Sequence, residues 1–358
     1  MQCMFDNIKS MPAKVCLGLS FLIGLLYSIN FIFFSSCAVI NGDGDCFALI
    51  YNGATPENEA YGRGAGTLYV AGALMFGVIT GNILIFNEGA KGKWTIMLPT
   101  IAGFTCLAIV LAPPFQGDYV TANNNPLYAT IAALGLYTAA YVMLKEEGVD
   151  EGLAFNMGIK LNNEAKYAVI ISSVIGTLYT VNHFFFADGY AGAGGSTLIP
   201  GFEEGSYWTD PIATTPLGYR VLASFFVTYV SMGLILLTNG AKGNWAVAHI
   251  LLFGISFFAL SVILGNIAVN DQVIPGDENS PYTPDTSTAT SNIVVSGFVM
   301  LLNIFAYFKM REEGVEEGMT FAGEDFTNSD DFFYKMYPAV TAGFAVLLLI
   351  ANFVTQPL

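Results

Sequence analysis

Charged residues are scarce in this chain. Asp, Glu, Lys and Arg make up 11% of its 358 residues, whereas a soluble domain usually carries about 25%. Hydrophobic residues reach 54% and aromatic residues 14%. This composition excludes a disordered chain and an ordinary soluble enzyme. Basic residues are fewest, 13 against 28 acidic ones, and the resulting net charge of −15 excludes nucleic acid as a partner. The composition therefore predicts an integral membrane protein.

Histidine and cysteine are also rare, with two and five copies. The five cysteines form no CxxC pair, so a zinc or iron–sulfur centre has no support. Cys37 and Cys46 flank one polar segment, and a disulfide or two free thiols are equally compatible with it. The sequence has no GxSxG, HExxH, P-loop or dinucleotide motif. We therefore expect no enzyme and no cofactor, with membrane lipids as the surrounding ligands.

What the chain does contain is long apolar stretches. A helix needs about 20 apolar residues to cross a bilayer, and nine stretches reach or approach this length. The sequence thus predicts an all-α polytopic membrane protein with about nine transmembrane helices. The stretches are 15–40, 65–87, 94–114, 126–144, 167–187, 219–238, 244–268, 290–308 and 336–354.

Lysine and arginine are distributed unevenly between the two sides of this nine-span arrangement. Eleven of them fall on the side of the N-terminus, and Arg63 and Arg220 fall on the other. The positive-inside rule places the basic side in the cytoplasm. We therefore expect a cytoplasmic-type N-terminus and a C-terminus on the opposite side of a membrane that the sequence does not identify.

Three segments of the first half recur in the same order in the second. The repeated features are an apolar segment with Tyr and Asn, a turn with Gly-Ala-Lys-Gly, and an acidic segment with Glu-Glu-Gly-Val. The matches predict two parallel four-span repeats, related by an axis along the membrane normal. The matched segments are 23–34 with 175–186, 87–94 with 238–245, and 141–152 with 307–318. The expected domains are 1–160, 161–325 and an additional C-terminal helix in 326–358.

A polar pair occurs at the same place in both repeats. Tyr27 and Asn30 correspond to Tyr179 and Asn182, and a spacing of three residues puts each pair on one helix face. Either the pair lines a pathway or binds a ligand, or it holds helices together, which is the commoner use of an isolated Asn in a membrane. His183, next to Asn182, belongs to the same patch, and helix packing is again the favoured role.

Acidic residues gather where each repeat ends, on the basic side of the membrane. These segments are candidates for docking a basic partner or a divalent cation, although a solvated acidic cap is the favoured explanation. Their members are Glu146, Glu147, Asp150, Glu151, Glu312, Glu313, Glu316 and Glu317.

The opposite side carries a short run, 41–45, with alternating oxygen ligands. Asp43 and Asp45 resemble the start of a calcium loop, but Asn52 stands where such a loop has its final Glu. We expect at most weak Ca²⁺ association with the acidic outer loops.

Three functions remain open. The favoured one is a non-catalytic scaffold or accessory subunit of a membrane assembly, with other membrane subunits or copies of the chain itself as partners. The alternative is a transporter or channel for a neutral or lipophilic solute, enclosed by two pseudo-symmetric halves. An intramembrane enzyme acting on lipid has least support, because the sequence shows no cluster of His, Asp or Glu near one membrane face. The predicted spans contain no Asp, Glu, Lys or Arg at depth, which argues against a proton pump or a cation-coupled transporter.

Overall fold

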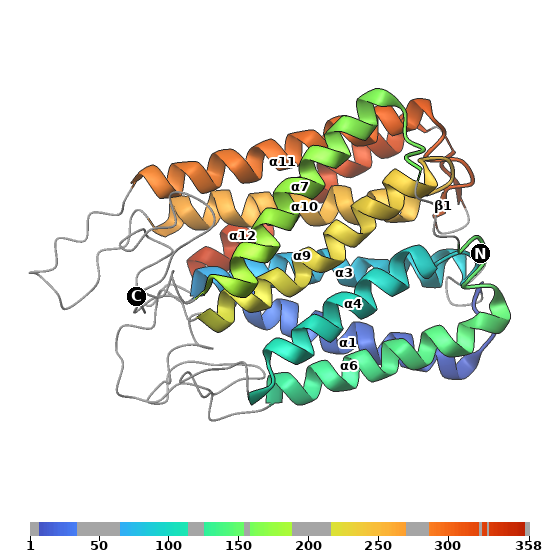
Figure 1. The fold of residues 1–358 in the computed structure, drawn as a ribbon, viewed down its shortest axis with the longest axis horizontal. Helices are drawn as coiled ribbons and strands as arrows, with labels where there is room; N and C mark the ends of the chain where they lie inside the picture. Colours follow the sequence, from blue (N-terminus) through green and yellow to red (C-terminus); the bar gives the residue numbers. More distant parts are fainter. Residues whose placement is uncertain are drawn as a thin grey trace, which may run out of the picture.

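The computed structural model describes residues 7–33, 65–113, 125–153, 158–187, 216–269, 286–321, 324–327 and 329–354. Within these ranges the protein is a bundle of helices that run along one long axis (Figure 1). A two-residue antiparallel strand pair, β1 (Thr320–Phe321) and β2 (Glu324–Asp325), is a minor addition. The predicted all-α polytopic fold is confirmed. The helices are α1 (Met11–Phe33), α3 (Ala65–Glu88), α4 (Trp94–Val110), α6 (Asn125–Met143), η3 (Leu144–Glu147), α7 (Asn163–Phe185), α9 (Pro216–Asn239), α10 (Trp245–Val269), α11 (Thr286–Glu312), η4 (Phe332–Met336) and α12 (Tyr337–Val354).

Eight helices in the described part of the chain are long and apolar enough to cross a membrane, which agrees with a multi-pass integral membrane protein. The apolar stretch expected at 94–114 forms a helix that is shorter than these eight. Its helix, α4, has 17 residues and ends before Leu111, and at 1.5 Å per residue it is about 25 Å long. The helix therefore falls a few ångströms short of the hydrocarbon core, which is about 30 Å thick.

Four helices form the centre of the bundle. α3 packs against α10 and α9 packs against α4, whereas α1, α6, α7 and α11 lie outside them. The span windows of α3, α9 and α10 are 83, 67 and 72% buried, against 28 to 39% for the four outer helices. We call α1, α3, α4 and α6 the first half, and α7, α9, α10 and α11 the second half.

Two close helix crossings join the halves. A Cβ added to Gly103 of α4 would lie 2.0 Å from Thr228 Oγ1 of α9, and one added to Gly77 of α3 would lie 2.6 Å from the Cα of Gly254 in α10. Glycine fits these points because an added Cβ would clash with the Thr228 side chain in the first crossing and with the backbone of α10 in the second. Direct contact between these helices therefore closes the middle of the bundle.

The basic residues gather at one end of the bundle. This end, here named the turn end, holds the start of α1 and the connections α3–α4 and α9–α10, and it lies beside the N-terminus and β1 in Figure 1. Arg220, in the first turn of α9, lies at the opposite end, and Arg63 is outside the described residues. The turn-end residues are Lys9, Lys14, Lys91, Lys93, Lys145, Lys160, Lys166, Lys242, Lys309, Arg311 and Lys335.

Candidate functional site

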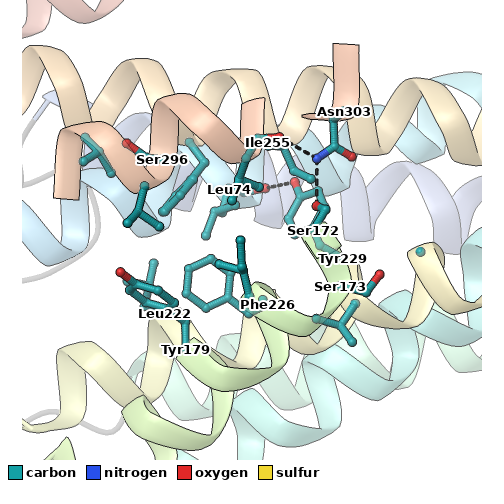
Figure 2. Close-up of a pocket in the computed structure, with 18 of the residues that line it drawn as sticks. Leu74, Ser172, Ser173, Tyr179, Leu222, Phe226, Tyr229, Ile255, Ser296 and Asn303 are labelled. Atoms are coloured by element: carbon teal, nitrogen blue, oxygen red, sulfur yellow. Dashed lines mark hydrogen bonds between the residues drawn. The ribbon is translucent and has the colours of Figure 1, made fainter. Parts of the chain in front are cut away.

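A cavity of about 110 Å³ lies between α7, α9, α10 and α11, and α3 completes its wall. We call it the larger cavity. Its wall is mostly aliphatic and aromatic, with Leu74, Leu222, Phe226 and Ile255 among its members (Figure 2). Among the described residues that line it, none is Asp, Glu, Lys or Arg. The cavity therefore suits a neutral, apolar occupant.

Three polar residues of this wall, Ser172, Tyr229 and Asn303, form hydrogen bonds within the protein. Asn303 Nδ2 donates to Ser172 Oγ at 2.8 Å and also to the carbonyl of Val299. The Tyr229 hydroxyl donates to the carbonyl of Leu74 at 2.8 Å (Figure 2). Because these polar groups are satisfied within the chain, they make no demand for water in the cavity.

Two residues of the predicted polar patch reach this wall. Tyr179 and His183 both line the larger cavity, with ring centroids 5.6 Å apart in an edge-on arrangement. The His183 ring also lies 5.1 Å from that of Tyr219. Asn182 is fully buried but is not a lining residue. The patch predicted from spacing is therefore divided: Tyr179 and His183 line the cavity, and Asn182 is buried away from it.

The first half has a smaller cavity, of about 50 Å³, between α1, α3, α4 and α6, with Val221 of α9 in its wall. The matched motifs show which residues of the two halves correspond. The difference in residue number is 152 between α1 and α7, 151 between α3 and α9 and between α4 and α10, and 166 between α6 and α11. Under these offsets, each of the thirteen residues that line the smaller cavity corresponds to one that lines the larger. Tyr27 corresponds to Tyr179, and Phe31 corresponds to His183. Asn30, like Asn182, is fully buried and lines neither cavity.

The larger cavity has smaller side chains at several corresponding positions. Ser173 and Gly233 lie close together, since a Cβ on Gly233 would be 2.6 Å from Ser173 Oγ. The corresponding first-half residues are a phenylalanine and an asparagine, which occupy more space. The replacements are Phe21 by Ser173, Asn82 by Gly233, Ile79 by Val230, and Tyr137 by Asn303.

The acidic segments at the turn end bind groups of this same chain. Glu147 accepts hydrogen bonds from the backbone N–H groups of Lys9 and Ser10, at 2.8 and 2.7 Å. Glu313 accepts from the backbone N–H of Asn162 at 3.1 Å. Each acid thus satisfies a donor at the start of a long helix, α1 or α7. Partial burial raises the pKa of Glu313 and the neighbouring Glu312 adds to this rise, while the Asn162 bond opposes it.

The turn end also contains one ion pair in each half, at corresponding positions. Lys91 pairs with Glu151 at 2.9 Å, and Lys242 pairs with Glu317 at 3.2 Å. These ion pairs are more than half exposed and contribute little to stability. The positive-φ glycines that shape the turns also match: Gly89 with Gly240, Gly92 with Gly243, Gly148 with Gly314, and Gly152 with Gly318.

A buried polar network distinguishes the second half. His249 Nε2 lies 2.8 Å from the Tyr307 hydroxyl, which donates to Glu316 Oε1 at 2.8 Å. Glu316 is fully buried and pairs with Arg311 Nε at 3.1 Å. The His249 ring stacks on Phe332 of η4 with centroids 4.0 Å apart. The network therefore fastens the segment before α12 to the core of α10 and α11.

The first half has a simpler version of this network. Asp150 accepts a hydrogen bond from the Tyr141 hydroxyl and pairs with Lys145 at 3.4 Å. Two acids of these segments lie outside both networks: Glu312 of the second half pairs with Lys309, and Glu146 of the first half is exposed. Most of the acids proposed for partner docking thus have a structural role within the chain, and docking itself stays a prediction.

The predicted calcium-binding residues, Asp43 and Asp45, lie outside the described residues, as do Cys37 and Cys46. In the part of the chain that the structure describes, no group of three or more His, Cys, Asp or Glu side chains is arranged to hold a metal ion.

Comparison with protein-family models, with curated proteins and with solved structures finds no match to this chain.

Sequence reasoning missed the cavity residues Ser172, Ser173, Gly233 and Asn303. They belong to no motif, and their small or neutral side chains look ordinary in a membrane helix. The alignment of the two halves contained a signal, because these positions replace larger first-half residues or keep a serine (Ser20 and Ser172). A comparison of side-chain volumes between corresponding helices identifies these cavity residues.

Proposed function

We propose that this chain is a non-catalytic scaffold or accessory subunit of a membrane assembly, built from two four-helix repeats and an additional C-terminal helix. One observation carries the proposal. α12 covers one face of α10 and α1. The corresponding face of α4 and α7 is not covered by any of the helices that the structure describes, and a partner's helix can bind there.

The contacts of α12 show how an additional helix packs on this face of the bundle. The Tyr337 hydroxyl lies 2.7 Å from Ser256 Oγ of α10. Phe344 stacks on Phe257 with ring centroids 4.0 Å apart, and further along the helix the Tyr69 hydroxyl of α3 donates to the carbonyl of Leu348. α12 also packs against α1. An aromatic hydroxyl and apolar side chains therefore hold this helix in place.

The counterpart surface, here named the α4–α7 face, consists of Thr105, Ile109, Leu178 and Val181. By sequence correspondence Thr105 stands where α10 has Ser256. Thr105 is exposed, and its hydroxyl donates to the Ile101 carbonyl just as that of Ser256 donates to the Leu252 carbonyl.

The apolar residues of the α4–α7 face are exposed as well: Ile109 is 49%, Leu178 46% and Val181 36% exposed. Leu26 and Ile29, which correspond to Leu178 and Val181, are half-buried on α1, where α12 packs. The occupant we propose is a single transmembrane helix of another subunit, apolar and with an aromatic hydroxyl at the depth of Thr105.

The closed centre supports this function over the alternative, a transporter for a neutral solute. A pathway between two pseudo-symmetric halves would run where they meet. At that place Gly103 contacts Thr228 and Gly77 contacts Gly254. We further propose that the turn end faces the cytoplasm, because eleven basic residues lie there and the positive-inside rule favours that side.

Mild detergent extraction from the native membrane, followed by mass determination, tests the proposal. We expect a complex larger than the 38.4 kDa chain, with a second subunit that contains at least one transmembrane helix. Leu178→Trp should release that subunit, because a bulky ring on the α4–α7 face displaces a packed helix. The matched control is Leu301→Trp, on the outer face of α11, where the leucine is 61% exposed.

Two outcomes would contradict the proposal. One is a wild-type particle that contains a single chain and no other subunit. The other is a complex that survives Leu178→Trp as well as it survives Leu301→Trp. In the first case solute flux in liposomes becomes the next measurement.

A further inference from the structure

We propose that the larger cavity holds one linear hydrocarbon chain, which enters from the bilayer between α7 and α11. This binding site is independent of the α4–α7 face. Its occupant is an acyl chain of a membrane lipid or an isoprenoid chain, which share the chemistry that the wall recognises.

The shape of the cavity favours a chain. Its lining residues on α7 extend from Val169 to His183, fourteen positions apart, which is about 21 Å along a helix axis. A space of about 110 Å³ spread over this length is narrow. This elongated shape matches a segment of a linear hydrocarbon, whereas a compact ring would occupy a small part of its length.

The chemistry of the wall favours a hydrocarbon. The Asn303–Ser172 bond and the Tyr229–Leu74 bond leave these polar groups satisfied without a ligand. Ser296 Oγ likewise donates to the carbonyl of Asn292. Apolar cavities stay dry and bind apolar molecules; one of roughly 150 Å³ takes up benzene. A dry, empty cavity loses packing contacts that a hydrocarbon would restore.

The arrangement of the helices provides an entrance. α7 and α11 pack against each other, and the Asn303–Ser172 bond joins them near the middle of both helices. In Figure 1 the two ribbons diverge toward the end opposite the turn end. Tyr179 of α7 and Val295 of α11 line the cavity and are also partly exposed. Because both helices are long and apolar enough to cross a membrane, the exposed side of these two residues is where a lipid chain would enter.

The chain itself supplies the substitution that fills the cavity. Phe21 occupies the first-half position that corresponds to Ser173, and the first-half cavity has less than half the volume of the larger one. Ser173→Phe should therefore exclude the hydrocarbon. Val174→Phe is the matched control, because it adds the same ring one residue further on, where the valine is 52% exposed.

The experiment is purification of the whole chain from native membranes, extensive detergent washing, and mass spectrometry of the small molecules that remain. We expect about one chain-bearing molecule per protein in the wild type and in Val174→Phe, and about tenfold less in Ser173→Phe. The mass identifies the source: a glycerolipid or fatty acid gives an acyl chain, and a terpenoid gives an isoprenoid chain.

Val230→Ile provides a second test should the Ser173→Phe protein not fold. It introduces the first-half residue, Ile79, at a wall position and adds a single methylene, so we expect a folded protein with reduced occupancy. A washed wild-type protein that carries no such molecule would overturn the proposal. So would a Ser173→Phe protein that retains as much of the molecule as Val174→Phe does. If Ser173→Phe does not fold, the same comparison is made with Val230→Ile.

Discussion

The backbone N–H of Ser10, at the start of α1, donates to a carboxylate oxygen of Glu147, at the end of η3, over 2.7 Å. The same relationship joins Asn162 to Glu313 at the start of α7. Ser10 and Asn162 each also accept from a backbone N–H three residues on, that of Ala13 or Ala165. An acidic segment therefore ties the last helix of each half to its first.

This relationship predicts the effect of removing the acid. Glu147→Ala should lower the free energy of unfolding by about 1 kcal/mol, since two backbone donors at a helix start lose a charged acceptor that is partly exposed to solvent. Glu146→Ala is the control, because Glu146 is exposed, and should have an effect within about 0.5 kcal/mol. Thermal unfolding in detergent measures both. Equal effects of the two substitutions would contradict the capping role of Glu147.

Close contact between the halves gives a second prediction. Gly103→Ala should destabilise the protein by about 1–3 kcal/mol, because the added Cβ would lie 2.0 Å from Thr228 Oγ1. Gly135→Ala, in the middle of α6, has nothing within 4 Å of its added Cβ. It should be neutral or stabilising by up to about 1 kcal/mol.

A double substitution tests whether the contact itself is responsible. Adding Thr228→Gly to Gly103→Ala removes the threonine side chain and should recover part of the lost stability. It gives α9 the residue that α3 has at the corresponding position, Gly77. Without any recovery, the crossing of α4 and α9 would not be the source of the loss.

The buried network of the second half leads to a third prediction. Arg311→Met should cost about 3–5 kcal/mol, because it leaves the fully buried Glu316 carboxylate without its cation. Lys145→Met is the matched change in the first half, where the Lys145 and Asp150 side chains are 53% and 33% exposed. Its cost should stay below about 1 kcal/mol. Similar unfolding midpoints for the two variants would show that the Glu316 pair is weaker than its burial implies.

The sequence was sufficient to predict the helices, because apolar stretches of this length leave a membrane chain few alternatives. It predicted less about α4, where Leu111 and Ala112 extend the apolar stretch past the end of the helix. The matched segments are most similar in their turns, where Gly89 and Gly240 adopt positive φ angles that favour glycine.

Pairing between helices was beyond sequence reasoning. The crossing of Gly103 with Thr228 joins the first half to the second, and no periodicity along one helix indicates which other helix it meets. The acidic segments were interpreted as a surface because the sequence does not show that Glu147 lies beside Ser10. The cavity was missed for the same reason, since its volume depends on five helices at once.

The matched asparagines provide the last prediction. Asn30 and Asn182 are fully buried and line neither cavity, which supports a role in holding helices together. Asn30→Leu combined with Asn182→Leu should lower stability by about 1 kcal/mol per site, a typical value for a polar contact between membrane helices. Thr177→Leu, on the exposed face of α7, is the control and should leave the unfolding midpoint nearly unchanged. If the double variant instead keeps its midpoint and alters solute flux in liposomes, the asparagines belong to a pathway and the transporter alternative gains support.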